Sequence, residues 1–283
     1  MNVLTVNNLT KSYPGFKLDA VSFSLEEGKI TGFIGRNGAG KSTTLNSLFN
    51  FVHPDSGEIS FFGLDFKQSE TEIKEKIGFV SSGVNYYPNK KIKKISAVTK
   101  MFYKQWDDDA YQKYMKMFQL DERKTPSRLS AGMKVKYALT LALSHNADLL
   151  ILDEPTSGLD PVSRDDLLDV FMNLCDAGKT ILFSTHITSD LDKCADNIIY
   201  IKNGKLVSEK PLKEFKSSYK LVSFDNQDAL AKYQPYILGI KRNKDDYTAL
   251  IESKDALHFD CEVHNADLEA IMIHIEKEAE SNA

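Results

Sequence analysis

The order of hydrophobic and polar positions predicts alternating strands and helices over the first 210 or so residues. The runs "LTVNNL", "LDAVSFSLE", "KITGFIG" and "GEISFFG" alternate or are wholly apolar and are separated by turn residues, which favours strands. The run "KSTTLNSLFNFV" predicts a helix. Further along, helices are expected over 131–144, 161–176 and 188–194, with the strands "DLLILDE", "TILFSTH" and "NIIYIKNGKLV" around them. Strands that alternate with helices imply a mostly parallel sheet with helices on both faces.

Two regions depart from this rhythm. Residues 96–120 carry apolar side chains at helical spacing, which predicts an all-helical region. After Pro211 come "LVSF", a helix "DALAKY", a hairpin "ILGIKRNKDDYTALIE", "FDCEV" and a final helix "ADLEAIMIHIEKE". These elements predict a small α+β module that resembles an open-faced βαββα sandwich. We therefore expect a large domain over 1–212, with a helical subdomain at about 84–140, and an accessory module over 213–283.

Composition and charge exclude several classes of protein. With 42% hydrophobic residues the chain is typical of globular proteins, and no apolar run approaches the ~18 residues of a membrane span. The first residues, "MNVLTVNNLTKSY", lack the layout of a signal peptide, so a cytoplasmic protein is expected. Cys175, Cys194 and Cys261 are widely spaced and are expected to be reduced. A net charge of −4 disfavours a dedicated nucleic-acid binder. Residues 211–283 hold 9 basic against 14 acidic residues, which supports a separate module.

The stretch "GRNGAGKST" fits the pattern G-x-x-x-x-G-K-[ST] between a predicted strand and a predicted helix. Its glycines let the backbone N–H groups point at phosphate oxygens, and the helix adds its positive N-terminal end. Lys41 is expected to reach the β- and γ-phosphates of a nucleotide and Ser42 to ligate Mg²⁺. The alternative is a Gly-rich turn that matches the pattern by chance. The strand before it, the helix after it, and Lys and Ser at the required positions disfavour this alternative. The candidate residues of this cradle are Gly35, Asn37, Gly38, Ala39, Gly40, Lys41, Ser42 and Thr43.

A second feature is the pair of acids that ends the predicted buried strand in "DLLILDEP". Asp153 is expected to hold Mg²⁺, commonly through water, and Glu154 to polarise an attacking water molecule. The alternative is a solvated helix cap before Pro155. The nearby cradle favours the first interpretation.

These motifs, taken with four others, resemble the ATP-binding-cassette (ABC) ATPases. "LSAGM" at 129–133 resembles the LSGGQ signature of that family, "SGLD" at 157–160 its D-loop, and "STH" at 184–186 its switch histidine. Tyr13 matches the aromatic residue that stacks on adenine. The elements follow one another in order over residues 1–210. The resemblance implies an α/β fold of the ABC-type P-loop ATPases, with a mostly parallel sheet core, an antiparallel β subdomain and a helical subdomain, and ATP and Mg²⁺ as cofactors.

The resemblance also implies that two such domains pack head to tail around two ATP molecules. Ser130 and the N–H of Gly132 would cap the γ-phosphate bound to the partner chain, and Asp160 would reach across the dimer. His186 would contact the γ-phosphate and orient the catalytic water. Ser130 by itself is equally a plain N-cap of the helix that follows it. The signature departs from the family pattern at Ala131 and at Met133, which stands in place of glutamine.

A single cassette without sustained heptads resembles the ATPase subunit of a membrane transporter whose membrane segments lie on another polypeptide. The N-terminal half and the ending resemble bacterial ATPases that export antibiotics or amphipathic peptides, phenol-soluble modulin exporters among them. The implied partners are a second ATPase, identical or not, and an integral membrane permease, which would hold the chain at the inner face of the cell membrane. A regulatory switch that binds ATP with little turnover is the alternative. The presence of both Glu154 and His186 favours hydrolysis.

The stretch "KIGFVSSGVNYYPNKKIKK" over residues 76–94 is the least family-like. Ser82 stands where the family has a glutamine that touches Mg²⁺, and serine is too short to reach the ion without an intervening water. Tyr86, Tyr87 and Pro88 are expected to face a partner or to pack on the helical subdomain. The lysines at 90–94 are either solvated or face lipid head groups or an acidic helix of the permease. The role of the acidic C-terminal module, to sense a ligand, brace the dimer or cover the sheet, stays open.

Overall fold

The protein forms two compact units in its computed structural model. The first comprises Met1–His186 with Lys193–Glu209, and the second Ile187–Asp192 with Lys210–Ala283. Each unit is described by itself. The structure describes residues 1–81, 87–226, 230, 232–244 and 246–281.

The centre of the first unit is a six-stranded sheet with the strand order β10-β9-β3-β8-β7-β6. β3 pairs in parallel with β8 and β9, and β7 in parallel with β8 and β6. Every residue of β3 and β8 is buried, because helices cover both faces of a parallel sheet. The predicted mostly parallel core is confirmed. The strands are β3 (Ile30–Ile34), β6 (Ile77–Ser81), β7 (Leu149–Asp153), β8 (Thr180–Thr185), β9 (Asn197–Lys202) and β10 (Lys205–Pro211).

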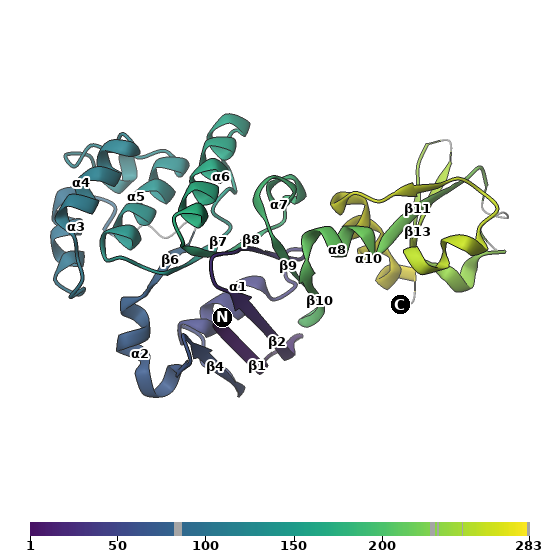
Figure 1. Ribbon diagram of the computed structural model, residues 1–283, viewed down its shortest axis with the longest axis horizontal. Coiled ribbons are helices and arrows are strands. Elements are labelled where there is room, and N and C mark those ends of the chain that lie inside the picture. The colour runs from purple at the N-terminus through teal and green to yellow at the C-terminus, as the bar shows by residue number, and fades with distance from the viewer. Residues whose placement is uncertain (82–86, 227–229, 231, 245, 282–283) are drawn as a thin grey trace. The chain divides into compact units, whose positions relative to one another are not determined.

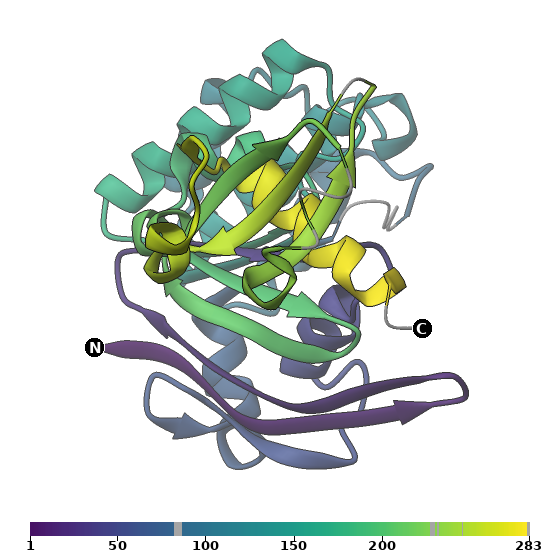
Figure 2. The ribbon, with the colours of Figure 1, turned by 90° about the vertical axis from the view of Figure 1, so that its right-hand side faces the viewer.

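A second sheet of this unit is antiparallel, with the order β2-β1-β4-β5. Its strands are β1 (Asn2–Tyr13), β2 (Phe16–Glu26), β4 (Ser56–Phe61) and β5 (Leu64–Asp65). Figure 2 shows β1 and β2 as a long purple hairpin. Apolar residues of this sheet, of α1 (Lys41–Leu48) and of α2 (Phe66–Glu75) form one buried cluster with the parallel strands. The antiparallel β subdomain is thereby confirmed.

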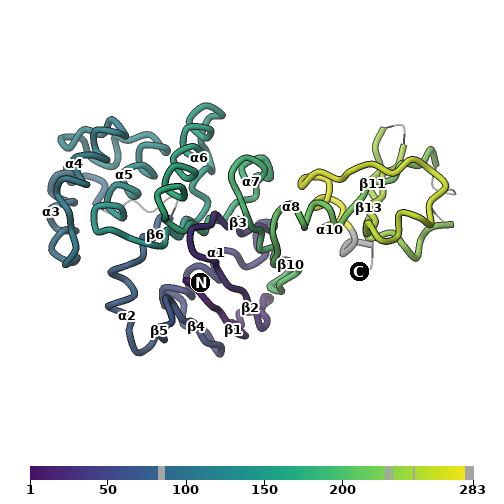
Figure 3. The backbone as a smooth tube through the Cα atoms, in the orientation of Figure 1, coloured from purple at the N-terminus to yellow at the C-terminus, as the bar shows by residue number. Residues whose placement is uncertain are grey.

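A group of helices fills the segment between β6 and β7. It holds α3 (Ile92–Lys100), α4 (Asp108–Met117), the short 3-10 helix η1 (Pro126–Arg128) and α5 (Ala131–Ser144). In Figure 3 the chain can be followed from α3 through α4 and α5 back to the sheet. The helix predicted over 131–144 is confirmed as α5, and the one over 161–176 as α6 (Pro161–Asp176).

The region 96–120, predicted to be all-helical, holds the end of α3 and the whole of α4, with a break between the two helices. The Asp107 carboxylate accepts the N–H groups of Asp109 and Ala110 at 2.8 and 3.0 Å and so starts a new helix. The ring of Tyr103 stacks on His145 at a centroid distance of 3.8 Å, which holds the intervening segment against the end of α5. Tertiary contacts override the helical spacing here.

The second unit is a four-stranded antiparallel sheet with the order β12-β13-β11-β14. The expected βαββα topology has three strands, and the structure adds a fourth, β14. Much of the helix predicted from "DALAKY" lies outside the described residues. α10 packs on β12, where a Cβ on Gly239 would lie 2.1 Å from the His274 carbonyl oxygen. The elements are α7 (Thr188–Cys194), which spans both units, α8 (Leu212–Ser217), β11 (Tyr219–Phe224), η2 (Gln234–Tyr236), β12 (Ile237–Arg242), β13 (Tyr247–Glu252), η3 (Ser253–His258), β14 (Val263–Asn265) and α10 (Leu268–Ser281).

Among the described helices of the chain, none has both the length and the apolar character needed to cross a membrane.

Candidate nucleotide site

The predicted cradle is the loop that joins β3 to α1, and two of its glycines are fixed by their surroundings. A Cβ on Gly35 would lie 2.3 Å from the carbonyl oxygen of Ile201 on β9, so no other residue fits there. Gly40 has a φ of +111° and lies against the ring of Phe16, whose Cζ would be 3.0 Å from an added Cβ. The loop therefore curls tightly against the sheet before α1 begins, as an anion-binding loop requires.

Lys41 is the first residue of α1 and is only 6% exposed. Its Nζ donates a hydrogen bond of 2.7 Å to the Gly35 carbonyl oxygen. The same Nζ lies 3.4 Å from Oε1 of Glu154. A buried ammonium group thus points into the loop, beside the carboxylate of the residue that follows β7.

The carboxyl ends of β6, β7 and β8 bring three polar residues into one row. The strand register pairs Ser81 with Asp153 and Asp153 with Ser184. The Ser184 hydroxyl donates to Oδ1 of Asp153 at 2.6 Å and accepts the Glu154 N–H at 2.9 Å. The Ser42 hydroxyl donates to the same Oδ1 at 3.3 Å. Ser184, which is fully buried, positions both acids and was missed as a site residue, although it begins the "STH" motif.

Glu154 lies just beyond β7 with a φ of +50°, an uncommon backbone conformation that turns its side chain toward the cradle. Its Oε2 is 2.9 Å from Nδ1 of His186, which follows β8. Because a carboxylate oxygen only accepts hydrogen bonds, this one requires a proton on Nδ1 of His186. The other ring nitrogen, Nε2, is not used in this hydrogen bond. Glu154, His186 and Lys41 therefore converge on one point.

A pocket of about 650 Å³ opens in front of this point. Its volume falls within the range of ~300–1,000 Å³ that is usual for small-molecule sites. Four of its lining residues were not predicted as site residues: Gly15, Phe16, Arg36 and Ser157. The lining residues are Gly15, Phe16, Arg36, Asn37, Gly38, Gly40, Lys41, Ser42, Thr43, Glu154, Ser157 and His186.

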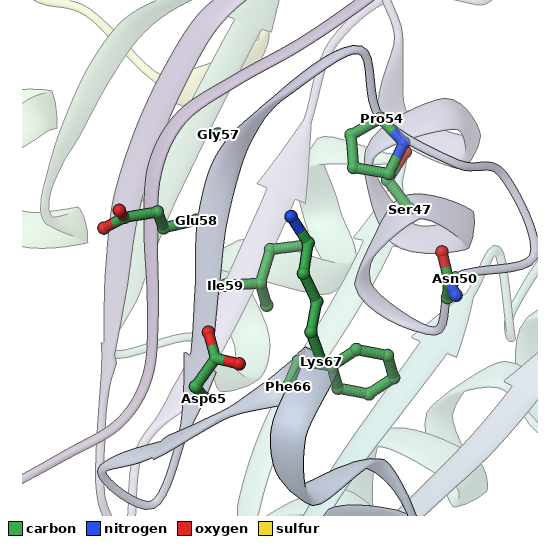
Figure 4. A pocket seen from close by; sticks show the side chains of 9 residues that line it. All are labelled: Ser47, Asn50, Pro54, Gly57, Glu58, Ile59, Asp65, Phe66 and Lys67. Atoms are coloured by element: carbon green, nitrogen blue, oxygen red, sulfur yellow. The ribbon is translucent and has the colours of Figure 1, made fainter.

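A second cavity, between α1 and the α2 region, is too small to compete as a nucleotide site. Its volume is about 50 Å³, room for only a few water molecules. Figure 4 shows the residues around it, with the Lys67 side chain crossing the view. Asp65, which lines it, also caps α2 by accepting the Gln68 N–H at 3.0 Å.

Tyr13 does not belong to the lining of the large pocket. Its side chain is 42% exposed, and its ring centroid lies 6.5 Å from that of Phe16. Phe16 is the aromatic residue that reaches the pocket wall, because the turn at Gly15 folds β2 back along β1 toward the cradle. Stacking of adenine on Tyr13 stays a prediction.

Ser130, Gly132 and Asp160 likewise do not line the pocket of their own chain. The Ser130 hydroxyl caps α5 by accepting the Met133 N–H at 3.2 Å. Asp160 caps α6 by accepting the Ser163 N–H at 3.0 Å, and hydrogen bonds from Ser163 hold the pKa of its carboxyl below the ordinary value. Both residues thus have a local role at a helix start, the reading that the sequence left open for Ser130.

The oxygen atoms of Ser42 and Asp153 fit a hard cation such as Mg²⁺. In the part of the chain that the structure describes, no three His, Cys, Asp or Glu side chains group as metal ligands. An ion at Ser42 and Asp153 would therefore complete its shell with phosphate oxygens and water. Ser82 and Tyr86 lie outside the described residues.

Comparisons with known proteins agree with this geometry. The family described as ABC transporter matches residues 18–157. A bacitracin transport ATP-binding protein of Bacillus licheniformis is 29% identical over 99% of this chain and 88% of the relative. One of Enterococcus faecalis is 30% identical over 87% of this chain and 81% of the relative. A linearmycin resistance ATP-binding protein of Bacillus subtilis is 32% identical over 73% and 68%.

Solved structures give the same answer for the fold. An ATP-binding subunit of an ABC transporter superposes with a TM-score of 0.68 at 26% identity, over 76% of this chain and 92% of that one. A bacterial ABC transporter cassette solved as a dimer superposes with a TM-score of 0.66 at 26% identity, over 74% and 98%. With the phosphate cradle and its converging Lys41, Glu154 and His186, these likenesses show that the chain belongs to the ATP-binding proteins of ABC transporters and is an ABC-type ATPase.

Proposed function

We propose that this chain hydrolyses ATP to drive export of antibiotics or amphipathic peptides through a separate membrane permease. The convergence of Lys41, Glu154 and His186 on one pocket is the observation that carries the hydrolysis. The direction and cargo class rest on relatives named for bacitracin transport and linearmycin resistance. Phenol-soluble modulins are amphipathic peptides and fall within this class. The chain would then lie on the cytoplasmic side of the membrane, held there by its permease.

Hydrolysis follows from the positions of the three side chains. Lys41 neutralises charge on the β- and γ-phosphates, with the N–H groups of the cradle and the N-terminus of α1. Glu154 polarises the attacking water and accepts its proton. His186 holds the Glu154 carboxylate through Nδ1–H and turns Nε2 toward the γ-phosphate.

Ser42 and Asp153 are proposed to hold Mg²⁺, which neutralises phosphate charge when bound. Ser184 is a positioning residue for this pair, since its hydroxyl fixes Oδ1 of Asp153 at 2.6 Å. Its second hydrogen bond, from the Glu154 N–H, ties the base to the same point.

We further propose that the pocket is completed by a second chain, identical or not. The N-terminus of α5, with Ser130 and Gly132, presents backbone N–H groups suited to an anion but lies outside the pocket of its own chain. Asp160 starts α6 in a similar exposed position. A cassette solved as a dimer, at 26% identity, supports this arrangement.

Gly132→Asp tests the dimer. A Cβ at this position would meet Leu159 Cδ2 at 3.5 Å, an ordinary contact, so the single chain should fold and bind ATP normally. The added carboxylate would repel the partner's γ-phosphate, so ATP-promoted dimerisation in gel filtration and phosphate release should both be lost. Dimerisation at the wild-type level would contradict the arrangement.

Phosphate release with Mg-ATP, compared between the wild type and Glu154→Gln, tests the catalytic role. We expect a loss of ~100-fold or more, equivalent to ~2.7 kcal/mol in the barrier. Glu27→Gln, at an exposed turn, is the matched control and should keep the full rate. Equal rates for Glu154→Gln and the wild type would exclude Glu154 as the base. Phosphate release by the wild type no faster than without protein would favour a regulatory switch.

Residues 213–283 are proposed to form an accessory module. Deleting 215–283 and measuring the ATPase rate and the dimer content separates its three candidate roles. If the deletion changes neither the ATPase rate nor the dimer content, the module neither braces the dimer nor regulates turnover, and the role of covering the sheet is supported.

A further inference from the structure

The segment 87–106, which contains α3, has an unusual charge for this protein. It holds six lysines and no acidic residue, although the chain as a whole has a net charge of −4. Lys100 forms an ion pair with Asp108. The four lysines around the N-terminus of α3 are all exposed, and among the described residues none of them has an ion-pair partner. We call them the basic end of α3: Lys90, Lys91, Lys93 and Lys94.

α3 is anchored from one side only. Ile92 and Ser96 are 0% and 4% exposed, and the Ser96 hydroxyl is hydrogen-bonded to the hydroxyls of Tyr111 and Tyr137, each at 2.9 Å. Positions three and four residues apart share one face of a helix. Lys93 and Lys94 therefore project away from this anchor, and Lys90 lies just before the helix. Figure 1 shows α3 at the outer edge of the group formed with α4 and α5.

Large apolar side chains continue this outer face beyond the lysines. Val98, Met101 and Phe102 are 52%, 82% and 75% exposed. Val98 lies one turn after Lys94, and Met101 lies two turns after Lys93. Three exposed apolar side chains within five residues form a patch, and such patches mark binding surfaces. We call these residues the apolar end.

The basic end is unfavourable for the helix itself. The N-terminus of a helix carries positive partial charge, so neighbouring lysines destabilise it. α3 has no acidic residue in its first turn to offset this repulsion. Helix stability therefore does not account for the lysines, whereas an anionic partner would relieve the repulsion.

We propose that the outer face of α3 docks directly on an anionic lipid surface. Lysine side chains place their ammonium groups at head-group phosphates on flexible stems, while Met and Phe side chains enter the boundary below. An acidic protein surface would satisfy the lysines. The exposed apolar end protrudes at the outer edge of the unit, however. A lipid surface can deform around such side chains, whereas a protein would need a matching groove. This contact is additional to any permease and does not depend on ATP turnover.

Flotation of the full chain with vesicles tests the contact. Vesicles that contain phosphatidylglycerol should retain the protein, in a salt-sensitive manner, and vesicles of phosphatidylcholine alone should not. Lys93→Glu/Lys94→Glu should weaken retention by about 25-fold or more, since each surface lysine contributes about fivefold. Met101→Ser/Phe102→Ser should weaken it by about tenfold or more.

The matched control reverses two exposed lysines elsewhere on the first unit, Lys67→Glu/Lys205→Glu, with the same change in net charge. It should float like the wild type, and the ATPase rate should be unchanged in all three variants. Equal loss in the control would show a general charge effect and overturn the proposal, as would no preference for phosphatidylglycerol. Retention only by vesicles that also hold the permease would overturn it in favour of a protein partner.

Discussion

Gly78 in β6 is the position where the structure predicts the sharpest response to one added methyl group. A Cβ there would lie 2.4 Å from Cβ of Ala142 on α5 and 2.8 Å from Cδ2 of Leu150. The leucine methyl is the far end of a flexible side chain. The Ala142 Cβ is fixed to the α5 backbone, so the helix must move away from the strand. Overpacking of this kind costs ~1–3 kcal/mol, and we expect ~2 kcal/mol for Gly78→Ala.

A second substitution isolates the clash. Ala142→Gly alone should cost ~1 kcal/mol in helix propensity. In the double variant the 2.4 Å contact no longer exists. Its free energy of unfolding should therefore be close to that of Ala142→Gly, with a coupling energy of ~1–2 kcal/mol. Urea unfolding followed by Trp106 fluorescence measures this, since Trp106 is the only tryptophan of the chain and packs in the helical region.

Gly132→Ala in the same helix is the control for the glycine change itself. Its Cβ would find only ordinary contacts, at 3.5 Å from Leu159, so the stability should be unchanged or raised. Two results would refute the reasoning. One is a loss below ~0.5 kcal/mol for Gly78→Ala, and the other is strict additivity in the double variant.

Three further outcomes are expected. Ser184→Ala should lower the free energy of unfolding by ~1–3 kcal/mol in urea titrations, because the partly buried Glu154 N–H loses its acceptor. Burial holds the pKa of His145 below its ordinary value of 6.5, while Glu75 opposes this shift and Lys179 adds to it. The unfolded chain therefore takes up the proton first, so stability followed by Trp106 should fall as the pH drops below about 6.5, and His145→Gln should flatten this dependence. Lys93→Glu should raise the free energy of unfolding by ~0.5 kcal/mol, since a carboxylate suits the start of a helix.

The parts of the fold that follow from local chemistry could be predicted from the sequence. α5 starts directly after the capping Ser130, and α6 starts at Pro161 after the capping Asp160, so both helices begin where the pattern placed them. The run of apolar residues before Asp153 placed the acids at a strand end. In each case the signal lies within a few residues of the feature.

Features made by register or by distant contacts could not be predicted in this way. Ser184 gains its role because β7 and β8 pair in a register that puts its hydroxyl opposite Asp153. Phe16 reaches the cradle only because β2 folds back on β1, far in sequence from Gly40. The local sequence around Ser184 does not show that it pairs with Asp153, and the sequence around Phe16 does not show that it lies beside Gly40. The family pattern pointed to Tyr13 instead of Phe16.

The contacts of α5 join the nucleotide site to the outer face of α3. At its N-terminus lie the residues proposed to meet the partner's ATP. Its middle packs on β6 through Gly78 without any intervening side chain, and β6 ends at Ser81, opposite Asp153. The hydroxyl of Tyr137 on α5 is bonded to Ser96 of α3 at 2.9 Å. Because packed elements move as units, a displacement of α5 on ATP-driven dimerisation would be transmitted to α3 and to the end of β6 together.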